Sequence, residues 1–331
     1  ARAGIIDISN FAKYVVQGAG AQGWLDAIFA NKMPSKIGGS CLTPLISKRG
    51  GVAGDFTVTR VEDTEYWIIG SGVAERYHQR YFQQVPLPEG TTFESKTDSV
   101  CGFNVAGPKA RILLQRLTNT SLETVDFPFM HSRRCVFAGV EVVALRVSFT
   151  GDLGWELHCE AADQSTLYAA LLEAGQGVDA GPVGSRALMS LRLEKGYGSW
   201  SREYSPEYWP HEVGLDRLCK LETSFLNKTA LSEVLQQPAR ERLVLLAIDT
   251  AAASASDADA TGGEPIFKDG VGIGRVTSGG YGYSVNMSLA LGFVKGAKAG
   301  DRVEVFILGR PHAARILERP PFDAKGIRLR A

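Results

Sequence analysis

Hydrophobic and polar positions along this chain follow two spacings, one typical of strands and one typical of helices. Apolar residues at every second position, bounded by turn residues, predict short strands, whereas spacings of three or four predict helices. Helices and strands alternate irregularly, which predicts an α+β fold without a regular βαβ repeat. We expect helices over residues 9–30 and 73–82, from residue 108 onward, and up to residue 194. We expect strands over residues 5–8, 41–46, 55–60, 66–69, 100–105, 142–149 and 155–159.

The pattern changes near residue 236. A strand is expected over residues 243–248, and residues 250–263 (TAAASASDADATGG) are small and polar, with no means of burying a core. Short Gly-rich strands follow, a spacing typical of a small β-barrel or sandwich. We therefore predict an α+β region over residues 1–235 and a β domain over residues 236–331. The short strands are expected over residues 264–267, 272–278, 289–295 and 302–308.

The composition is that of an ordinary globular protein and argues against several functions. Hydrophobic residues make up 44% and charged residues 22% of the 331 positions. Lys plus Arg equals Asp plus Glu at 36 each, so no net field favours nucleic acid or an anionic membrane. No apolar run is long enough to predict a membrane span. The chain enters structured sequence at once and without Met, so we expect a domain cut from a longer polypeptide or a chain lacking its first residues.

Cysteine and histidine usage bears on compartment and on metal binding. The five cysteines are scattered without a CxxC motif, which indicates a reducing compartment, and we expect a cytoplasmic protein. The five histidines lie far apart and outside any ligand motif, so no metal site is expected. The GxSxG motif of hydrolases and the GxGxxG dinucleotide fingerprint are both missing from the sequence.

A single carboxylate stands out in residues 189–200, MSLRLEKGYGSW. This stretch predicts the end of a helix, because Ala187, Leu191 and Glu194 share one helical face and Gly196 is a typical helix stop. The helix dipole disfavours a negative charge at that end. Two explanations are open for Glu194: a buried ion pair with an arginine, or a carboxylate that binds a ligand carrying N–H donors.

Aromatic residues gather directly after this helix, and two more stand in the β domain. Such a cluster either packs between domains or lines a slot for a flat ring. Tyr281 and Tyr283 are flanked by glycines. The cluster after the helix comprises Tyr197, Trp200, Tyr204, Tyr208 and Trp209.

Five segments then stand in an order that carries a family resemblance. Together they resemble the glycine-cleavage T-protein (aminomethyltransferase) family, and most closely the C-terminal folate-binding part of dimethylglycine and sarcosine dehydrogenases. The resemblance covers essentially the whole chain. The segments are GGVAGDFTV (50–58), FTGDLGWEL (149–157), LRLEKG (191–196), FLNKTAL (225–231) and VTSG (276–279).

The resemblance implies a three-lobed ring of two interleaved α+β modules and a C-terminal β-barrel, with tetrahydrofolate entering a central hole. It also implies that Glu194 holds the pterin. A carboxylate can accept two parallel N–H bonds from the pterin's amidine-like edge. Thr150 and Trp155 belong to a turn that the resemblance places beside the folate, although position alone fits an ordinary hairpin equally well. The other candidate folate-binding residues are Tyr197, Trp200, Tyr281 and Tyr283.

Asp55 is the candidate catalytic residue. T-proteins carry two adjacent acids after the Gly-Gly turn, whereas this sequence has Gly54 and then Asp55. The resemblance therefore implies that Asp55 lies near the reacting folate nitrogen, as proton acceptor or electrostatic stabiliser. Turn preferences alone also fit a residue that starts a strand. With the first acid missing, aminomethyl transfer from a lipoyl group is not expected.

The sequence thus predicts an enzyme that transfers a one-carbon unit to tetrahydrofolate. The unit would come from oxidation of a small N-methyl amine of the dimethylglycine or sarcosine type and would leave as methylene-tetrahydrofolate. FAD is expected only on an upstream domain or a partner oxidoreductase. One alternative is a folate-dependent demethylase that moves a methyl group directly from a sulfonium or aryl ether. Another is a noncatalytic folate-binding relative of the iron–sulfur-assembly branch, whose Lys-Gly-Cys motif has no counterpart in residues 225–230.

Overall fold

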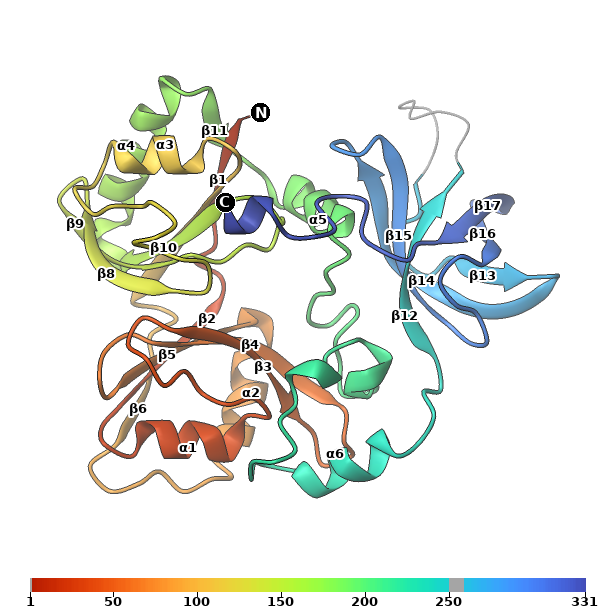
Figure 1. Ribbon diagram of the computed structural model, residues 1–331, viewed down its shortest axis with the longest axis horizontal. Coiled ribbons are helices and arrows are strands. Elements are labelled where there is room, and N and C mark those ends of the chain that lie inside the picture. The colour runs from red at the N-terminus through yellow and green to blue at the C-terminus, as the bar shows by residue number, and fades with distance from the viewer. Residues whose placement is uncertain (1, 250–258) are drawn as a thin grey trace.

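Two β-sheets and a closed β-barrel form three lobes, and the helix α5 (Ser185–Glu194) lies between the barrel and one of the sheets (Figure 1). The computed structural model describes residues 2–249 and 259–331, so most of the small-residue run at 250–263 lies outside the described residues. Each lobe has its own hydrophobic core. This confirms the predicted α+β fold with two modules and a C-terminal β-barrel.

The first lobe is a five-stranded antiparallel sheet with strand order β3-β4-β5-β2-β6. The strands predicted over residues 41–46 and 55–60 are confirmed and pair as a hairpin around the Gly-Gly turn: Gly50 has φ +77°, and a Cβ atom there would lie 2.8 Å from the carbonyl oxygen of Ala230. Two helices cover the sheet with an aromatic core. The elements are β2 (Ala12–Gln17), α1 (Ala21–Ile28), β3 (Ser40–Ile46), β4 (Val52–Arg60), β5 (Glu65–Gly70), α2 (Glu75–Phe82) and β6 (Thr92–Ser95).

The second lobe is a six-stranded sheet with order β11-β1-β7-β10-β9-β8. Its strand β1 comes from the start of the chain, whereas the next strand, β2, belongs to the first lobe. The two modules are therefore interleaved in sequence. The elements are β1 (Ala3–Asp7), β7 (Val100–Ala106), α3 (Ala110–Gln115), β8 (Ser132–Phe137), β9 (Val140–Leu145), β10 (Gly154–Glu160), α4 (Gln164–Gln176) and β11 (Ala180–Pro182).

The barrel follows α6 (Lys228–Leu235) and closes in the order β12-β15-β14-β13-β16-β17. Its predicted strands are present, and β14 runs four residues beyond its expected end at residue 278. The strand β17 was not predicted. The barrel strands are β12 (Arg242–Ile248), β13 (Pro265–Lys268), β14 (Val271–Gly282), β15 (Met287–Val294), β16 (Arg302–Ile307) and β17 (Arg310–Ile316).

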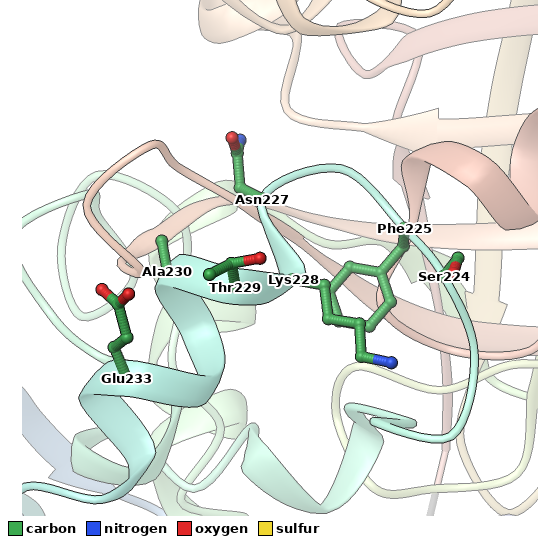
Figure 2. A pocket seen from close by; sticks show the side chains of 7 residues that line it. All are labelled: Ser224, Phe225, Asn227, Lys228, Thr229, Ala230 and Glu233. Carbon is green, nitrogen blue, oxygen red and sulfur yellow. The ribbon is translucent and has the colours of Figure 1, made fainter.

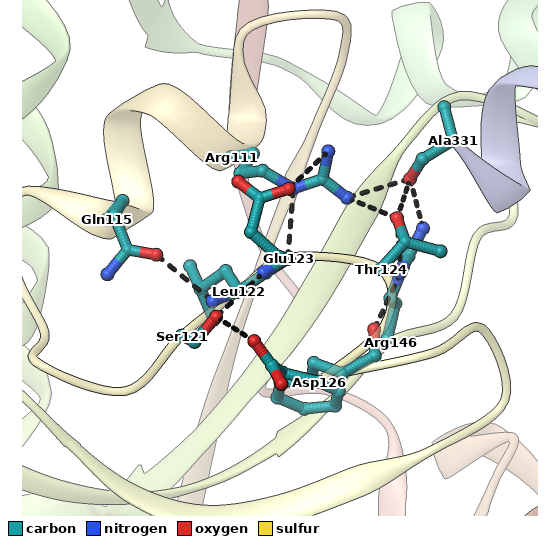
Figure 3. Close-up of polar contacts among 10 residues, drawn as sticks. Arg111, Gln115, Ser121, Leu122, Glu123, Thr124, Asp126, Arg146 and Ala331 are labelled. Carbon is teal, nitrogen blue, oxygen red and sulfur yellow. Dashed lines mark hydrogen bonds and ion pairs between the residues drawn. The ribbon is translucent and has the colours of Figure 1, made fainter.

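After β17 the chain returns to the second lobe. The backbone N–H of Phe322 donates to the Glu194 carbonyl at 3.1 Å, and Lys195 pairs with Asp323. At residue 331 the carbonyl oxygen of Ala331 accepts bonds from Arg111, Thr124 and the buried Arg146 (Figure 3). This last segment therefore joins the barrel, the end of α5 and the six-stranded sheet.

The helix predicted over residues 9–30 is wrong in its first half. Residues 12–17 form the strand β2, and only residues 21–28 are helical. Phe11 and Val15 suggested a helix because they are four residues apart. Positions four apart also share one face of a strand, and both residues pack together against the core between the two sheets. Ala12, Tyr14 and Val16 fill the opposite face.

The strand predicted over residues 142–149 also ends early. β9 stops at Leu145, and the next residue, Arg146, is fully buried rather than facing solvent. The backbone of Arg146 still bonds to residues 130 and 131, and its side chain donates to the carbonyl oxygen of Phe127 at 2.6 Å. In α3 (Ala110–Gln115) the apolar spacing predicts that both Ile112 and Leu113 face inward; Leu113 is buried, but Ile112 is 54% exposed.

Candidate functional site

Glu194 is a buried carboxylate with one oxygen left without a partner. It is the last residue of α5, only 1% exposed, and Gly196 with φ +68° turns the chain away, as the sequence predicted. Its Oε1 accepts the backbone N–H of Ser284 at 2.8 Å. Its Oε2 has no hydrogen-bond partner among the described residues. A buried acceptor without a donor costs about 1–3 kcal/mol, and more when it is charged. This oxygen is therefore suited to a ligand that brings N–H groups.

Two other glutamates are buried, and both pair with arginine. Glu203 lies 2.8 Å from Arg192, and Glu212 lies 2.6 Å from Arg240. Glu194 has no such ion pair in the part of the chain that the structure describes. The sequence left open an ion pair between Glu194 and an arginine. Arg192, which lies on α5 with Glu194, pairs with Glu203 instead.

The strand end of β14 lies against Glu194. Ser190, one turn earlier on α5, donates its hydroxyl to the Tyr281 carbonyl at 2.5 Å. A Cβ atom at Gly282 would lie 3.0 Å from the Cγ atom of Glu194, so a side chain there would crowd the carboxylate. Tyr281 and Tyr283 meet edge to face at 5.0 Å, and Tyr283 is 77% exposed. The structure therefore brings both predicted tyrosines to the Glu194 end of α5.

The turn predicted to lie beside the folate packs on the same helix end. Phe149 stacks on Tyr197 with ring centroids 6.4 Å apart, and the adjacent Thr150 is buried. A Cβ atom at Gly151 would lie 2.7 Å from the Cδ atom of Lys195. Burial raises the pKa of Tyr197, so its hydroxyl stays protonated and can donate. Tyr197 follows Glu194 by three residues, and the turn that holds Thr150 packs on Lys195 and Tyr197 directly after the helix.

Trp155 has a different environment. It is fully buried in the core of the second lobe, edge-on to Phe127 at 6.3 Å and beneath the Arg146 guanidinium at 5.4 Å. Its ring N–H has no partner among the described residues. These contacts fit the hairpin role that position alone allowed for Trp155, and its contact with folate stays a prediction.

Asp55 lies inside a strand rather than at its start. It is the fourth residue of β4, paired with Pro44 of β3. Burial raises its pKa to about 6. It lies close enough to Tyr204 that its charge adds to burial in raising the pKa of that phenol. A carboxyl group titrating near neutral pH, without an ion pair in the described structure, is suited to accept a proton.

The structure also explains the missing first acid. A Cβ atom at Gly54 would lie 2.6 Å from Phe56 and 2.8 Å from Nε2 of His78. His78 is fully buried, and burial lowers its pKa to about 4, so it is neutral near pH 7. Two rings therefore fill the space that a side chain at position 54 would need. Asp55 stands as the single acid of this segment.

The aromatic residues after α5 have different surroundings. Trp200 lies 5.1 Å from His78 and 6.1 Å from Tyr77, beside the strand that carries Asp55. Tyr208 stacks on Phe293 of the barrel at 3.7 Å. Interdomain packing is thus confirmed for Tyr208. A depression of about 450 Å³ runs between this loop and β14, lined by Trp200, Ser201, Arg202, Ser205, Pro206, Glu207, Tyr208, Arg275 and Thr277.

A second depression, of about 570 Å³, lies over the FLNKTAL segment. Figure 2 shows the polar ends of Asn227, Lys228 and Glu233 pointing in different directions. Asn227 is engaged in a bond to the Ile46 carbonyl at 2.8 Å. These side chains do not converge on one ligand, so this segment joins α6 to the first lobe instead of forming a site.

Two negative findings concern the described residues. No group of three or more His, Cys, Asp or Glu side chains among residues 2–249 and 259–331 is arranged to hold a metal ion. Over the same residues, no helix is both long and apolar enough to cross a bilayer.

Several contacts of the site could not be found from the sequence. Ser190, Arg192 and Glu194 of α5 bond to residues that lie 11 to 91 positions away in the chain: Tyr281, Glu203 and Ser284. The VTSG segment was the one available signal, because its Thr277 and Ser278 both bond to Glu203.

Comparison with protein families identifies two known domains in the chain. The sequence model of the GCVT N-terminal domain matches residues 1–223, and that of the glycine cleavage T-protein C-terminal barrel domain matches residues 242–323. The solved structure of glycine cleavage system aminomethyltransferase T from Bartonella henselae superimposes with a TM-score of 0.87 at 23% identity, covering 98% of this chain and 87% of that one. This likeness confirms the fold.

Curated relatives fall into two kinds. Mitochondrial dimethylglycine dehydrogenase of Mus musculus is 34% identical over 325 residues, covering 96% of this chain but 37% of that protein. Mitochondrial sarcosine dehydrogenase of the same species is 28% identical, covering 99% and 38%. Aminomethyltransferase of Thermotoga petrophila is 27% identical, covering 98% and 87%. The chain therefore spans little more than a third of the two dehydrogenases and most of the transferase.

Proposed function

Because the chain belongs to the glycine cleavage T-protein family, we propose that it binds tetrahydrofolate and transfers a one-carbon unit to it. The free, buried Oε2 of Glu194 carries this proposal. The pterin ring presents adjacent N–H donors on one edge, and a carboxylate has about four acceptor positions. Ser284 uses one of these positions. The remaining ones, on both oxygens, are available to the pterin.

The residues around Glu194 fit a flat, partly polar ligand. Tyr281 and Tyr283 belong to the end of β14 that contacts the carboxylate through Gly282 and Ser284, and Tyr197, which follows α5, stacks on Phe149 next to Thr150. Aromatic side chains supply contact area to a planar ring, and the buried setting strengthens the hydrogen bonds to Glu194. We propose these residues, with Trp200, as the folate-binding set. Trp155 supports the turn from within the core.

Tetrahydrofolate supplies a nucleophilic ring nitrogen that accepts the one-carbon unit. The protein contributes orientation and exclusion of water, because binding at Glu194 fixes the pterin edge. We propose that Asp55 takes up the proton released as the nitrogen reacts. Its pKa of about 6 keeps it mostly ionised, and thus able to accept, at pH 7.

We further propose that the one-carbon unit comes from an N-methyl amine of the dimethylglycine or sarcosine type and leaves as methylene-tetrahydrofolate. The 34% identity to dimethylglycine dehydrogenase supports this choice, as does the space at Gly54, which cannot hold the first acid of the T-proteins. Oxidation of the amine would require an FAD-dependent domain or partner. The five free cysteines support a reducing compartment, and we propose the cytoplasm.

The folate product distinguishes the candidate functions. In separate reactions, the protein and tetrahydrofolate would be incubated with formaldehyde, with a sulfonium donor or with an aryl methyl ether. The folate products would be identified by mass spectrometry. We expect methylene-tetrahydrofolate from formaldehyde, faster than the spontaneous reaction and slowed by Asp55→Asn. Formation of 5-methyl-tetrahydrofolate would instead support the demethylase. If wild type and Asp55→Asn both gave the spontaneous rate, the protein would not catalyse the reaction, and the noncatalytic folate-binding function would remain.

A further inference from the structure

The buried pair Arg192–Glu203 joins the end of α5 to the loop that follows it. The two side chains are fully buried, and Nη1 of Arg192 donates to Oε2 of Glu203 at 2.8 Å. The same Nη1 donates to the Tyr197 carbonyl at 2.8 Å. Oε2 of Glu203 also accepts the backbone N–H of Ser199 at 2.9 Å. The pair therefore fixes the loop that carries Tyr197 and Trp200.

The other oxygen of Glu203 bonds to the barrel. Oε1 accepts the hydroxyls of Thr277 at 2.7 Å and Ser278 at 2.5 Å, two consecutive residues of β14. Consecutive side chains of a regular strand point to opposite faces. Here the pairing of β14 with β15 shifts register between Val276 and Ser278. A bulge of this kind re-aims side chains, and it lets both hydroxyls reach one oxygen.

The same helix and the same strand meet again at Glu194. Ser190 of α5 bonds to the Tyr281 carbonyl, and the Ser284 N–H just beyond β14 bonds to Oε1 of Glu194. Glu203 therefore holds β14 five residues before its end at Gly282, while Ser190 and Glu194 hold the end itself. Three points of attachment set how the barrel lies against the carboxylate.

We infer that Arg192 and Glu203 are positioning residues: with Thr277 and Ser278 they hold α5, the aromatic loop and β14 in the arrangement that leaves Glu194 Oε2 without a donor from the described residues. This inference rests on the proposed binding of tetrahydrofolate at Glu194. A buried ion pair contributes little net stability, because the loss of hydration offsets the attraction, and its best-attested role is to fix register.

The matched control is Glu212, a second buried glutamate paired with an arginine. Its partner Arg240 follows α6, and its contacts lie with Trp209 and Arg240 rather than with α5 or β14. A loss of folate affinity that came only from weaker folding would follow the fall in the thermal midpoint in both Glu203→Gln and Glu212→Gln. A loss that came from misplacing Glu194 would appear in Glu203→Gln alone.

The experiment measures tetrahydrofolate affinity by calorimetry and the thermal midpoint for both variants. We expect affinity to fall about tenfold in Glu203→Gln and less than twofold in Glu212→Gln. Wild-type affinity in Glu203→Gln, or an equal loss in both variants, would overturn the inference. If the wild type itself does not bind tetrahydrofolate, the proposed function fails and this inference fails with it. If the wild type binds tetrahydrofolate and Glu203→Gln binds it with the same affinity, the inference fails but the proposed function stands.

A milder pair of variants covers the case in which Glu203→Gln does not fold. Thr277→Val keeps the shape and removes the hydroxyl, whereas Thr277→Ser keeps the hydroxyl. We expect affinity to fall about threefold in Thr277→Val and to stay near the wild-type value in Thr277→Ser. Equal affinities in the two variants would contradict a role for this bond.

Discussion

The three buried glutamates differ in how their charges are balanced. Glu203 and Glu212 are each held by an arginine and by further N–H or O–H donors. Burial alone raises the pKa of Glu212, but hydrogen bonds from Arg240 and from the Trp209 backbone lower it below its ordinary value. Glu194 is buried as deeply, yet it has one backbone donor and a free oxygen. Two of these carboxylates complete the fold, and the third is available to a ligand.

The largest expected effect is the loss of a balanced carboxylate. Glu203→Ala leaves Arg192 buried without its counter-charge, and we expect the free energy of unfolding to fall by about 3–5 kcal/mol. Glu212→Ala leaves Arg240, whose side chain is 48% exposed, so the loss should be smaller. Denaturant unfolding of both variants measures the difference. A Glu203→Ala protein as stable as the wild type would show that Glu203 is not needed to balance Arg192.

The next effect concerns Asp55, a carboxylate without a counter-charge in the described structure. Burial raises its pKa to about 6, above the value in an unfolded chain. Its contribution to stability is therefore fully present below about pH 4 and is lost as pH rises through 6. Asp55→Asn should stabilise the protein by about 1–3 kcal/mol at pH 8 and not at pH 4. The same stability difference at both values would contradict the raised pKa.

Asp55 should also shape the pH dependence of the reaction. If it accepts a proton, the rate of one-carbon transfer rises with pH through about 6 as the carboxyl group ionises. Asp55→Asn should remove this rise. Rates of methylene-tetrahydrofolate formation from pH 4.5 to 8 test it, and a variant that keeps the rise would assign the titration to another group.

The smallest expected effect is at the exposed edge of the site. Tyr283 is 77% exposed, so Tyr283→Ala should change the free energy of unfolding by less than about 0.5 kcal/mol. Loss of one aromatic contact should weaken tetrahydrofolate binding by about 0.5–1.5 kcal/mol. Thermal unfolding and calorimetry on the same preparation separate the two. Unchanged affinity would remove Tyr283 from the site.

Local patterns in the sequence were sufficient for most strands and for the end of α5. The Gly-Gly turn and alternating residues predicted the β3–β4 hairpin, and Gly196 predicted where the Glu194 helix stops. The pattern failed at residues 9–20, because apolar positions four apart fit one face of a strand as well as a helix.

The site itself depends on distant contacts. Nothing near Glu194 in the sequence shows that Arg192, two residues earlier, pairs with Glu203 and leaves Glu194 without a cation. The bulge that brings Thr277 and Ser278 to Glu203 arises from pairing with β15 and has no local signature in the chain. The packing of Phe56 and His78 over Gly54 likewise depends on the contact between β4 and α2, which the sequence does not predict.

The most direct test of this account is tetrahydrofolate binding to Glu194→Gln. The substitution keeps the shape of the side chain and the acceptor for Ser284, but it removes the charge and replaces one acceptor oxygen by a donor NH₂. Calorimetry should show affinity weakened by about 1.5–3 kcal/mol, with the thermal midpoint unchanged or higher because a buried charge is gone. Equal affinity for wild type and Glu194→Gln would contradict the central claim that Glu194 holds the pterin.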